Sequence, residues 1–300
     1  MLNKNDVFLR DRLSRVRITD DRSLRAVWVE FNYSGRPCFS TALLDEIQVA
    51  QKLIRQTALA GYEHDQDNRL LFQVLCSADE RVFNLGGDLV YFTELIEAQD
   101  REGLRRYARS CIDIQYASIT HFGIPFTTIA LVQGEALGGG FEAALSHNVL
   151  VAERRARFGF PEITFGMFPG MGALTLLTRK IAPSLARRLI MDNRVYTGEE
   201  LYEMGVVDVL APDGEGRAVV RDYMRRHAAL APGLHGFQAA VDRVLPVSYG
   251  ELSDIVDHWV DAALQLSDKN RRLMAYFARA QARRYGGTDE QRPEDRVQLS

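Results

Sequence analysis

Two glutamates, Glu142 and Glu162, are the side chains best suited to acid–base chemistry. Glu142 stands just after the triple glycine at 138–140, and Glu162 follows a proline. Both are flanked by apolar residues, and a carboxyl group in apolar surroundings has a raised pKa and can exchange protons near neutral pH. Each also has an ordinary explanation, as a carboxylate stabilised by a helix N-terminus or as a loop acid. Together they form a candidate acid/base pair.

Glycine-rich turns stand before Glu142 and again upstream, at Gly86 and Gly87. Each turn follows an apolar run and precedes a helical pattern, so its backbone N–H groups have no intrahelical partner and can hold negative charge. A lone turn of this kind most often serves tight packing. Neither turn has the Lys-Ser/Thr of a P-loop or the ribose-binding acid of a dinucleotide fold. We therefore expect polarisation of a carbonyl group rather than phosphate binding.

The histidines and cysteines do not have the spacing of known metal or nucleophile sites. His121 and His147 have neither zinc-site spacing nor a nearby serine motif, and we expect Ser146 and His147 to pack at a helix end. Three cysteines lie far apart without metal spacing, which favours reduced thiols and no strong nucleophile: Cys38, Cys76 and Cys111. We expect neither a metal nor a cofactor.

Composition limits the partners. The 300 residues are 46% hydrophobic and 26% charged, with a formal net charge of −3, so no global basicity favours a nucleic-acid partner. The N-terminus is too charged for a secretory signal, and no apolar run approaches the ~18 residues of a membrane span. We expect a soluble cytoplasmic protein.

The elements that position the candidate site alternate between strands and helices from residue 26 to 210, which is typical of an α/β sheet fold. Strands are predicted at 26–31, 70–75, 129–132, 149–152 and 206–210, and helices from Ser40, over most of 89–119, from 141, and at 173–181, 186–191 and 197–204. Residues 1–22 read as a polar cap and 61–68 as a loop. We divide the chain into a core with this cap (1–212), a helical region with apolar stripes (213–284) and a disordered tail (285–300).

Three motifs in order resemble the crotonase (enoyl-CoA hydratase/isomerase) superfamily over roughly residues 25–212: RVFNLGGDL at 81–89, GEALGGGFEAA at 134–144 and FGFPEITFGMFPGMGA at 158–173. The residues of these motifs are most similar to those of bacterial diffusible signal factor synthases. The resemblance implies an α/β spiral of ββα units, with C-terminal helices that help to form a homotrimer or hexamer.

The resemblance also implies roles for residues. Gly87 and Gly139 would form the oxyanion hole, and Glu142 and Glu162 match the two active carboxylates of the family's hydratases. Our own hypothesis for their roles is that one glutamate, Glu162 in preference to Glu142, removes a proton from C2, while Glu142 protonates the departing 3-hydroxyl group. The substrate would be a 3-hydroxyacyl thioester on acyl carrier protein or CoA, and the synthases of this family make a cis-2-enoyl thioester and hydrolyse it to the free acid. Further substrate contacts are expected from residues of the same motifs: Leu85, Gly86, Gly138, Phe141 and Met171.

Two alternatives stay open: a CoA-dependent enoyl-CoA hydratase or isomerase of fatty-acid metabolism, and an idle scaffold that binds a regulator or RNA. Retention of both glutamates and both turns disfavours the scaffold. The family further suggests a sensor kinase as a regulatory partner. A basic group could dock an acidic carrier protein or form a solvated helix face: Arg179, Lys180, Arg187 and Arg188. The sequence leaves acyl chain length and branching open.

Overall fold

The computed structural model describes residues 12–64 and 69–285. Within these ranges, no helix is long and apolar enough to cross a membrane. The predicted tail lies outside the described residues beyond position 285, as do residues 65–68 of the predicted loop and 1–11 of the predicted cap.

A six-stranded sheet forms the centre of the molecule, in the order β1-β2-β3-β5-β7-β10. β1 pairs with β2 in antiparallel fashion, and all other neighbours are parallel. The strands are β1 (Val16–Asp21), β2 (Ala26–Phe31), β3 (Phe72–Ser77), β5 (Thr127–Val132), β7 (Val149–Glu153) and β10 (Val209–Ala211). The strands from β2 to β7 are almost wholly buried, which explains their continuous apolar runs.

A second sheet of four short strands lies beside the first, in the order β4-β6-β8-β9. Its strands are β4 (Val82–Asn84), β6 (Glu135–Leu137), β8 (Arg157–Gly159) and β9 (Tyr196–Thr197). Three successive turns of the chain each give one strand to each sheet: β3 and β4, β5 and β6, β7 and β8. Helical segments follow each pair, namely α3 (Leu89–Glu97), α5 (Gly139–Leu145) and η3 (Pro161–Phe165) with α6 (Ala173–Leu177). The predicted α/β spiral of ββα units is confirmed.

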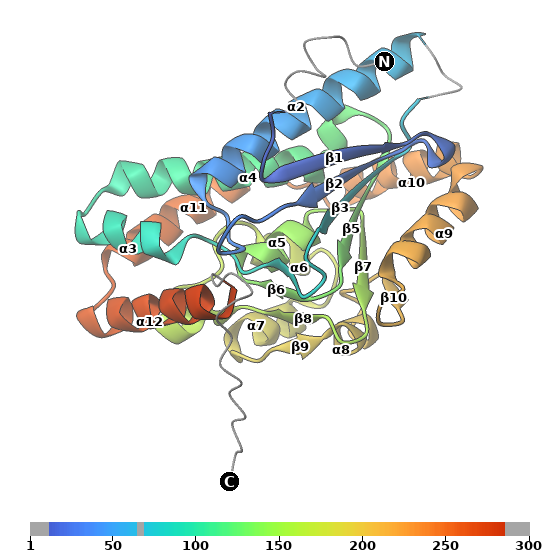
Figure 1. Cartoon of the computed structure of the whole chain (residues 1–300). Helices are drawn as coiled ribbons and strands as arrows, with labels where there is room; N and C mark the ends of the chain where they lie inside the picture. The colour runs from blue at the N-terminus through green and yellow to red at the C-terminus, as the bar shows by residue number, and fades with distance from the viewer. Residues whose placement is uncertain (1–11, 65–68, 286–300) are drawn as a thin grey trace.

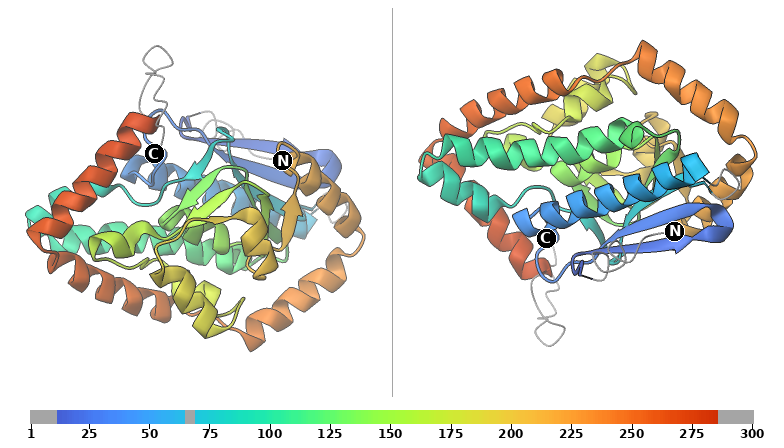
Figure 2. Two further views of the ribbon diagram at one scale, coloured as in Figure 1. Left: turned by 90° about the horizontal axis from the view of Figure 1, so that it is seen from below. Right: turned by 90° about the horizontal axis from the view of Figure 1, so that it is seen from above.

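Helices cover both faces of the large sheet (Figures 1 and 2). One face, with Val29 and Leu75, shares a core with α2 (Thr41–His64) and α4 (Arg101–Ile119). The other face, with Trp28 and Val74, packs against α9 (Gly216–Ala228). Smaller helical elements complete the core region: η1 (Arg22–Leu24), η2 (His121–Gly123), α7 (Pro183–Met191) and α8 (Gly198–Glu203).

After α9, three more helices run around the core: α10 (Ala231–Val244), α11 (Tyr249–Leu264) and α12 (Asp268–Tyr285). α11 packs along α4, and α12 packs against α3 and η3. The apolar stripe predicted for α11 is buried, with Leu252, Val256 and Val260 fully covered. The C-terminal helices therefore pack on the same core that carries the candidate site (Figure 2).

Several local predictions differ from the structure. Part of the predicted cap forms β1, and α2 continues through residues 61–64, where a loop was predicted. The pattern over 89–119 contains two helices, because Asp100 caps a new one by accepting from the Gly103 N–H at 2.8 Å. The second sheet was missed altogether. Strands of two or three residues are too short to show a period of two.

Candidate active site

The two predicted glycine turns approach each other at backbone contact distance. Gly86 has a φ of +94°, and a Cβ built there would lie 3.0 Å from the backbone nitrogen of Gly139. No side chain fits that approach, so glycine is required at position 86. Gly87 and Gly139 both line the cavity that Glu142 and Glu162 also line, and the N–H group of neither donates to an acceptor in the described part of the chain. Two free donors thus face the same space.

Hydrogen bonds fix both turns. The N–H of Gly86 donates to Asn84 Oδ1 at 2.7 Å, and the N–H of Gly138 donates to the carbonyl of Gly159 in β8 at 2.9 Å. Gly138 begins α5 with a φ of +51°, a conformation that favours glycine. The short strands of the second sheet therefore set the spacing between the two donors.

Glu142 lies in the first turn of α5 and is 1% exposed. Its Oε1 accepts from the backbone N–H groups of Met171 and Ala173, each at 2.9 Å. Both donors belong to the glycine-rich segment that leads into α6, which explains why this motif follows Glu142 in the chain. Burial raises the pKa of Glu142 to about 7, although the two N–H bonds favour the carboxylate.

Glu162 lies in η3, directly after Pro161. The residue is half-buried, but its Oε2 is enclosed and has no hydrogen-bond partner among the described residues. Its Oε1 lies over the glycine turn, where a Cβ on Gly138 would come within 2.2 Å of it. Burial, and to a smaller extent the charge of the nearby Glu142, raises the pKa of Glu162 to about 8.

Both carboxyl groups and both free N–H groups border one cavity, which contains about 1270 Å³ of empty space with its open mouth included. Its lining is mainly apolar and comes from α2, α3, α4, the sheet, η3 and the C-terminal helices. A mainly apolar lining with a few polar groups is typical of small-molecule sites. It suits a long apolar group whose reactive end lies at the glutamates.

The other predicted substrate contacts divide between the cavity and its surroundings. Leu85 and Met171 line the cavity, whereas Gly86 and Gly138 lie in the turns behind it. Phe141 is fully buried and packs against the rings of Phe158 and Phe160, at centroid distances of 5.0 and 4.9 Å. Several lining residues were not predicted from sequence: Phe92, Trp259, Met274, Phe277, Gln73, Gln115 and His147. They come from separate elements and share no local motif.

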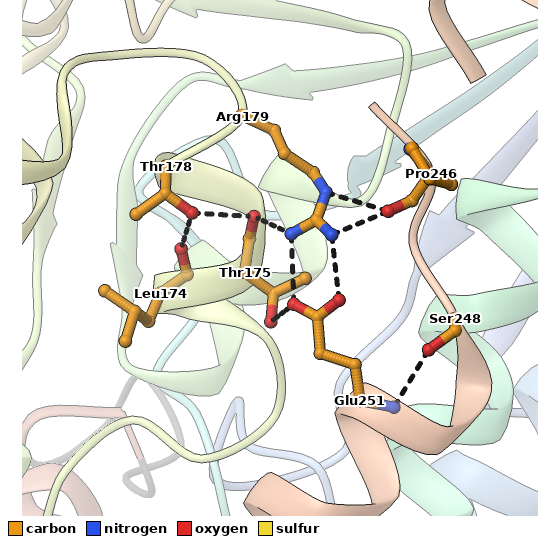
Figure 3. A network of polar contacts seen from close by, with 7 residues as sticks. All are labelled: Leu174, Thr175, Thr178, Arg179, Pro246, Ser248 and Glu251. Atoms are coloured by element: carbon orange, nitrogen blue, oxygen red, sulfur yellow. Dashed lines mark hydrogen bonds and ion pairs between the residues drawn. The ribbon is translucent and has the colours of Figure 1, made fainter. Parts of the chain in front are cut away.

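A polar network joins α6 to the C-terminal helices (Figure 3). Arg179 donates two hydrogen bonds to the carboxylate of Glu251, at 3.0 and 2.8 Å, and others to the carbonyl of Pro246. Thr175 Oγ1 donates to Glu251 at 2.7 Å. Thr175 lies in the same short helix as Ala173, so this network supports the segment that holds Glu142.

Two of the four basic residues considered for carrier docking therefore have intramolecular partners. Lys180 bonds Asp208 at 2.6 Å, in addition to the Arg179 pair. Arg187 and Arg188 are exposed on α7. The three cysteines are buried free thiols, and burial raises the pKa of Cys38 and of Cys76 to about 12. Thiols of this kind are weak nucleophiles near neutral pH.

A family model described as enoyl-CoA hydratase/isomerase matches residues 49–245. The 2,3-dehydroadipyl-CoA hydratase of Escherichia coli (strain K12) is 37% identical over 119 residues, which cover 39% of this chain and 46% of that protein. The probable enoyl-CoA hydratase EchA17 of Mycobacterium tuberculosis (strain ATCC 25618 / H37Rv) is 25% identical over 234 residues, 78% of this chain and 82% of that protein. The chain spans less than half the length of several curated relatives that it matches.

Solved structures agree on the fold. The crystal structure of an enoyl-CoA hydratase/isomerase from Xanthobacter autotrophicus Py2 superposes with a TM-score of 0.72, at 20% identity, over 90% of this chain and 95% of that chain. At that identity the likeness establishes the fold alone.

Proposed function

Because the chain belongs to the enoyl-CoA hydratase/isomerase family, we propose that it removes water from a 3-hydroxyacyl thioester to form a 2-enoyl thioester. The observation that carries the proposal is the arrangement of two buried carboxyl groups and two unengaged N–H groups around one apolar cavity. An isomerase that only moves a double bond can work with a single base. Dehydration needs both a base at C2 and an acid at the 3-hydroxyl group, which favours it here.

In the proposed mechanism, the thioester oxygen accepts hydrogen bonds from the N–H groups of Gly87 and Gly139. These donors stabilise the enolate that forms when Glu162 takes the proton from C2, and such a donor contributes about 3–4 kcal/mol in other enzymes. Glu142 then protonates the 3-hydroxyl group. The C3–O bond breaks, water leaves, and the electron pair from C2 forms the C2=C3 double bond.

In the free enzyme, the favoured protonation states of Glu142 and Glu162 are those that a completed dehydration would leave. The two N–H bonds to Glu142 favour its carboxylate, and the pKa of Glu162 is raised further by the neighbouring charge. The free enzyme thus favours a proton on Glu162 and none on Glu142, the distribution that dehydration leaves behind. Before another dehydration, the proton must return to Glu142. Hydration of an enoyl thioester would start directly from the resting state.

The motif resemblance supports a narrower form of the proposal. We infer that the substrate is carried on acyl carrier protein, that the double bond formed is cis, and that the same site hydrolyses the thioester to a free 2-unsaturated fatty acid used as a diffusible signal. The mainly apolar lining of the cavity supports a fatty-acyl group of this kind. A regulatory sensor kinase and assembly as a trimer or hexamer belong to the same proposal.

Expression in a bacterium that makes no such signal tests the proposal. Mass spectrometry should detect a released cis-2-unsaturated fatty acid, and the Glu142→Gln and Glu162→Gln variants should lower its formation by about 10²- to 10⁴-fold, the usual contribution of a general acid or base. Near-wild-type dehydration by either folded variant would contradict the mechanism.

Carrier preference separates this function from a CoA-dependent hydratase or isomerase of fatty-acid metabolism. The purified protein is incubated with 3-hydroxyacyl groups of one length on acyl carrier protein and on CoA, and initial rates are compared. We expect faster turnover on the carrier protein. Substantially faster turnover of the CoA thioester would support the alternative.

A further inference from the structure

Besides the two glutamates, the cavity lining contains three polar side chains that are more than nine-tenths buried and have an unpartnered polar atom. Gln73 and Gln115 are each 4% exposed and His147 is 5% exposed. Gln73 Oε1, Gln115 Oε1 and His147 Nε2 have no hydrogen-bond partner in the described part of the chain. Such a group costs about 1–3 kcal/mol when buried alone, so a fold that retains three of them along one cavity is suited to a polar ligand.

The tautomer of His147 follows from its neighbour. Its Nδ1 lies 2.9 Å from the carbonyl oxygen of Ala143, and a carbonyl only accepts, so Nδ1 must carry the hydrogen. Burial lowers the pKa of His147 to about 4, which leaves the ring neutral at physiological pH. Nε2 therefore carries a bare lone pair that no donor among the described residues meets, and a donor from a ligand would satisfy it.

Gln73 and His147 belong to one region of the lining. Gln73 lies in β3 opposite Thr128 of β5. The backbone N–H and the hydroxyl group of Thr128 both donate to Asn148 Oδ1, at 2.9 and 3.0 Å, and Asn148 directly follows His147. Gln73 and His147, which both line the cavity, are thus linked through the neighbouring Thr128–Asn148 pair.

Gln115 belongs to the reacting end instead. A Cβ on Gly172 would lie 3.2 Å from Gln115 Oε1, and the next residue, Ala173, donates to Glu142. His147, by contrast, follows the C-terminus of α5, whereas Gly139 begins that helix. The length of α5 separates the two by about 10 Å at 1.5 Å per residue. A chain whose carbonyl oxygen is bound at Gly139 would therefore have to extend several bonds beyond C3 to reach His147.

The charged residues of the cavity lining limit which polar group a ligand can place in the distal part of the cavity. Among the described residues around the cavity there is no arginine or lysine, and the only carboxyl groups are Glu142 and Glu162. A distal carboxylate would have no cation, and a distal ammonium group would have no anion outside the reacting centre. A hydroxyl group is uncharged, donates to His147 Nε2, and can accept from or donate to the amide of Gln73.

We propose that the natural acyl chain carries a hydroxyl group in its distal part, beyond C3, and that Gln73 and His147 bind it. The proposal rests on the dehydratase function above and names its substrate class as hydroxylated rather than plain fatty-acyl thioesters. The two residues would determine specificity, since a site built to hydrogen-bond a hydroxyl group discriminates strongly against an analogue that lacks it.

The test compares 3-hydroxyacyl thioesters of equal length with and without a second, distal hydroxyl group, placed at successive carbons. We expect kcat/KM to favour one hydroxylated isomer by at least ~10-fold in the wild type. The Gln73→Met and His147→Phe variants should reduce that preference to below ~3-fold, mainly through the hydroxylated substrate. Ser118→Ala is the matched control, because Ser118 lines the same cavity but its hydroxyl group already donates to the Ile114 carbonyl at 3.3 Å. Its preference should equal that of the wild type.

Binding to the wild-type protein provides a readout that needs neither turnover nor a folded variant. Isothermal titration calorimetry with the matched free 2-enoic acids should show tighter binding of the distally hydroxylated acid. Equal affinity for the two acids, together with equal kcat/KM, would mean that water satisfies these groups and would overturn the inference while leaving the dehydratase function intact. Absence of turnover with every thioester would instead contradict the dehydratase function.

Discussion

Glu142 and Glu162 differ in how their surroundings hold them, and that difference matters more than their common residue type. Two backbone N–H groups fix one oxygen of Glu142, whereas Glu162 has an enclosed oxygen without a partner among the described residues. Burial raises the pKa of both carboxyl groups, and the two charges interact. They therefore titrate as a pair, whose useful state carries one proton.

We predict a bell-shaped pH profile for kcat/KM with a maximum between about pH 7 and 8, the range of the two raised pKa values. At lower pH both carboxyl groups are protonated and no base remains; at higher pH both are ionised and no acid remains. Initial rates in buffers from pH 5 to 10 measure this. Glu142→Gln should lower the pKa of Glu162, because the neighbouring charge that raises it is removed. A flat profile across the range would count against the pair.

Gly87→Ala tests the proposed oxyanion donor of the upstream turn. A Cβ at position 87 would lie 2.5 Å from ring atoms of Phe92, so the turn or the ring must move. We expect kcat to fall by about 10²- to 10³-fold, as when one such donor is lost. The control is Gly35→Ala, where a Cβ meets no atom within 4 Å and rates should not change. Turnover of one thioester, with urea unfolding of both variants, makes the comparison.

At the scale of elements, the contact between α6 and α11 joins the site to the C-terminal helices (Figure 3). Burial opposes the charge of Glu251, but the hydrogen bonds from Arg179 and Thr175 outweigh it and lower the pKa of Glu251. The pair is bidentate, with Glu251 about one-third exposed, so its contribution is larger than that of an isolated surface pair but reduced by solvent.

Glu251→Gln should therefore lower the free energy of unfolding by about 1 kcal/mol at pH 7. Since the folded-state pKa is depressed, this stabilisation is fully present above the unfolded pKa of ~4.3 and is lost as the pH falls through the folded value. Urea unfolding at pH 7 and below pH 4 should show the difference between variant and wild type shrinking with acid. Glu94→Gln, at an exposed position on α3, is the control and should change the free energy of unfolding little at pH 7.

Sequence patterns identified the elements that are long or carry a local signal. β2 was predicted with the bounds it has, and the capping box of Thr197 and Glu200 begins α8 as expected. The residues of the two glycine turns and both glutamates could be found because each lies in a contiguous motif. The second sheet could not, since its strands are two or three residues long. Nor could Trp259 or Gln73, which reach the cavity only through tertiary packing.

At the scale of the whole molecule, the cavity is completed by the C-terminal helices. Trp259 of α11 is 4% exposed and packs on Gly170, where a Cβ would come within 2.4 Å of its ring. It also contacts the ring of Phe92, at a centroid distance of 5.1 Å. The predicted core (1–212) and the predicted helical region (213–284) both contribute residues to this cavity. The proposed boundary therefore divides the chain but not the candidate site.

Trp259→Ala should reduce the free energy of unfolding by about 3–5 kcal/mol, the cost of truncating a large buried aromatic residue. It should also raise KM for long acyl thioesters, because the cavity wall is lost. Thermal unfolding and steady-state kinetics measure the two effects. Tyr276→Ala on α12 is a suitable control, since that ring is 53% exposed and its loss should change neither quantity strongly. Unchanged stability of the Trp259 variant would contradict the described packing.

The close approach of Gly86 to Gly139 makes activity a strict reporter of folding. The first turn of the spiral supplies Gly87, the second supplies Gly139 and Glu142, and the third supplies Glu162, so no single turn contains all of the proposed catalytic groups. These contacts join residues far apart in the chain, and contacts of that kind form late because the intervening loops must close first. A chain with intact helices but one undocked turn would retain its helical spectrum and have no catalytic centre.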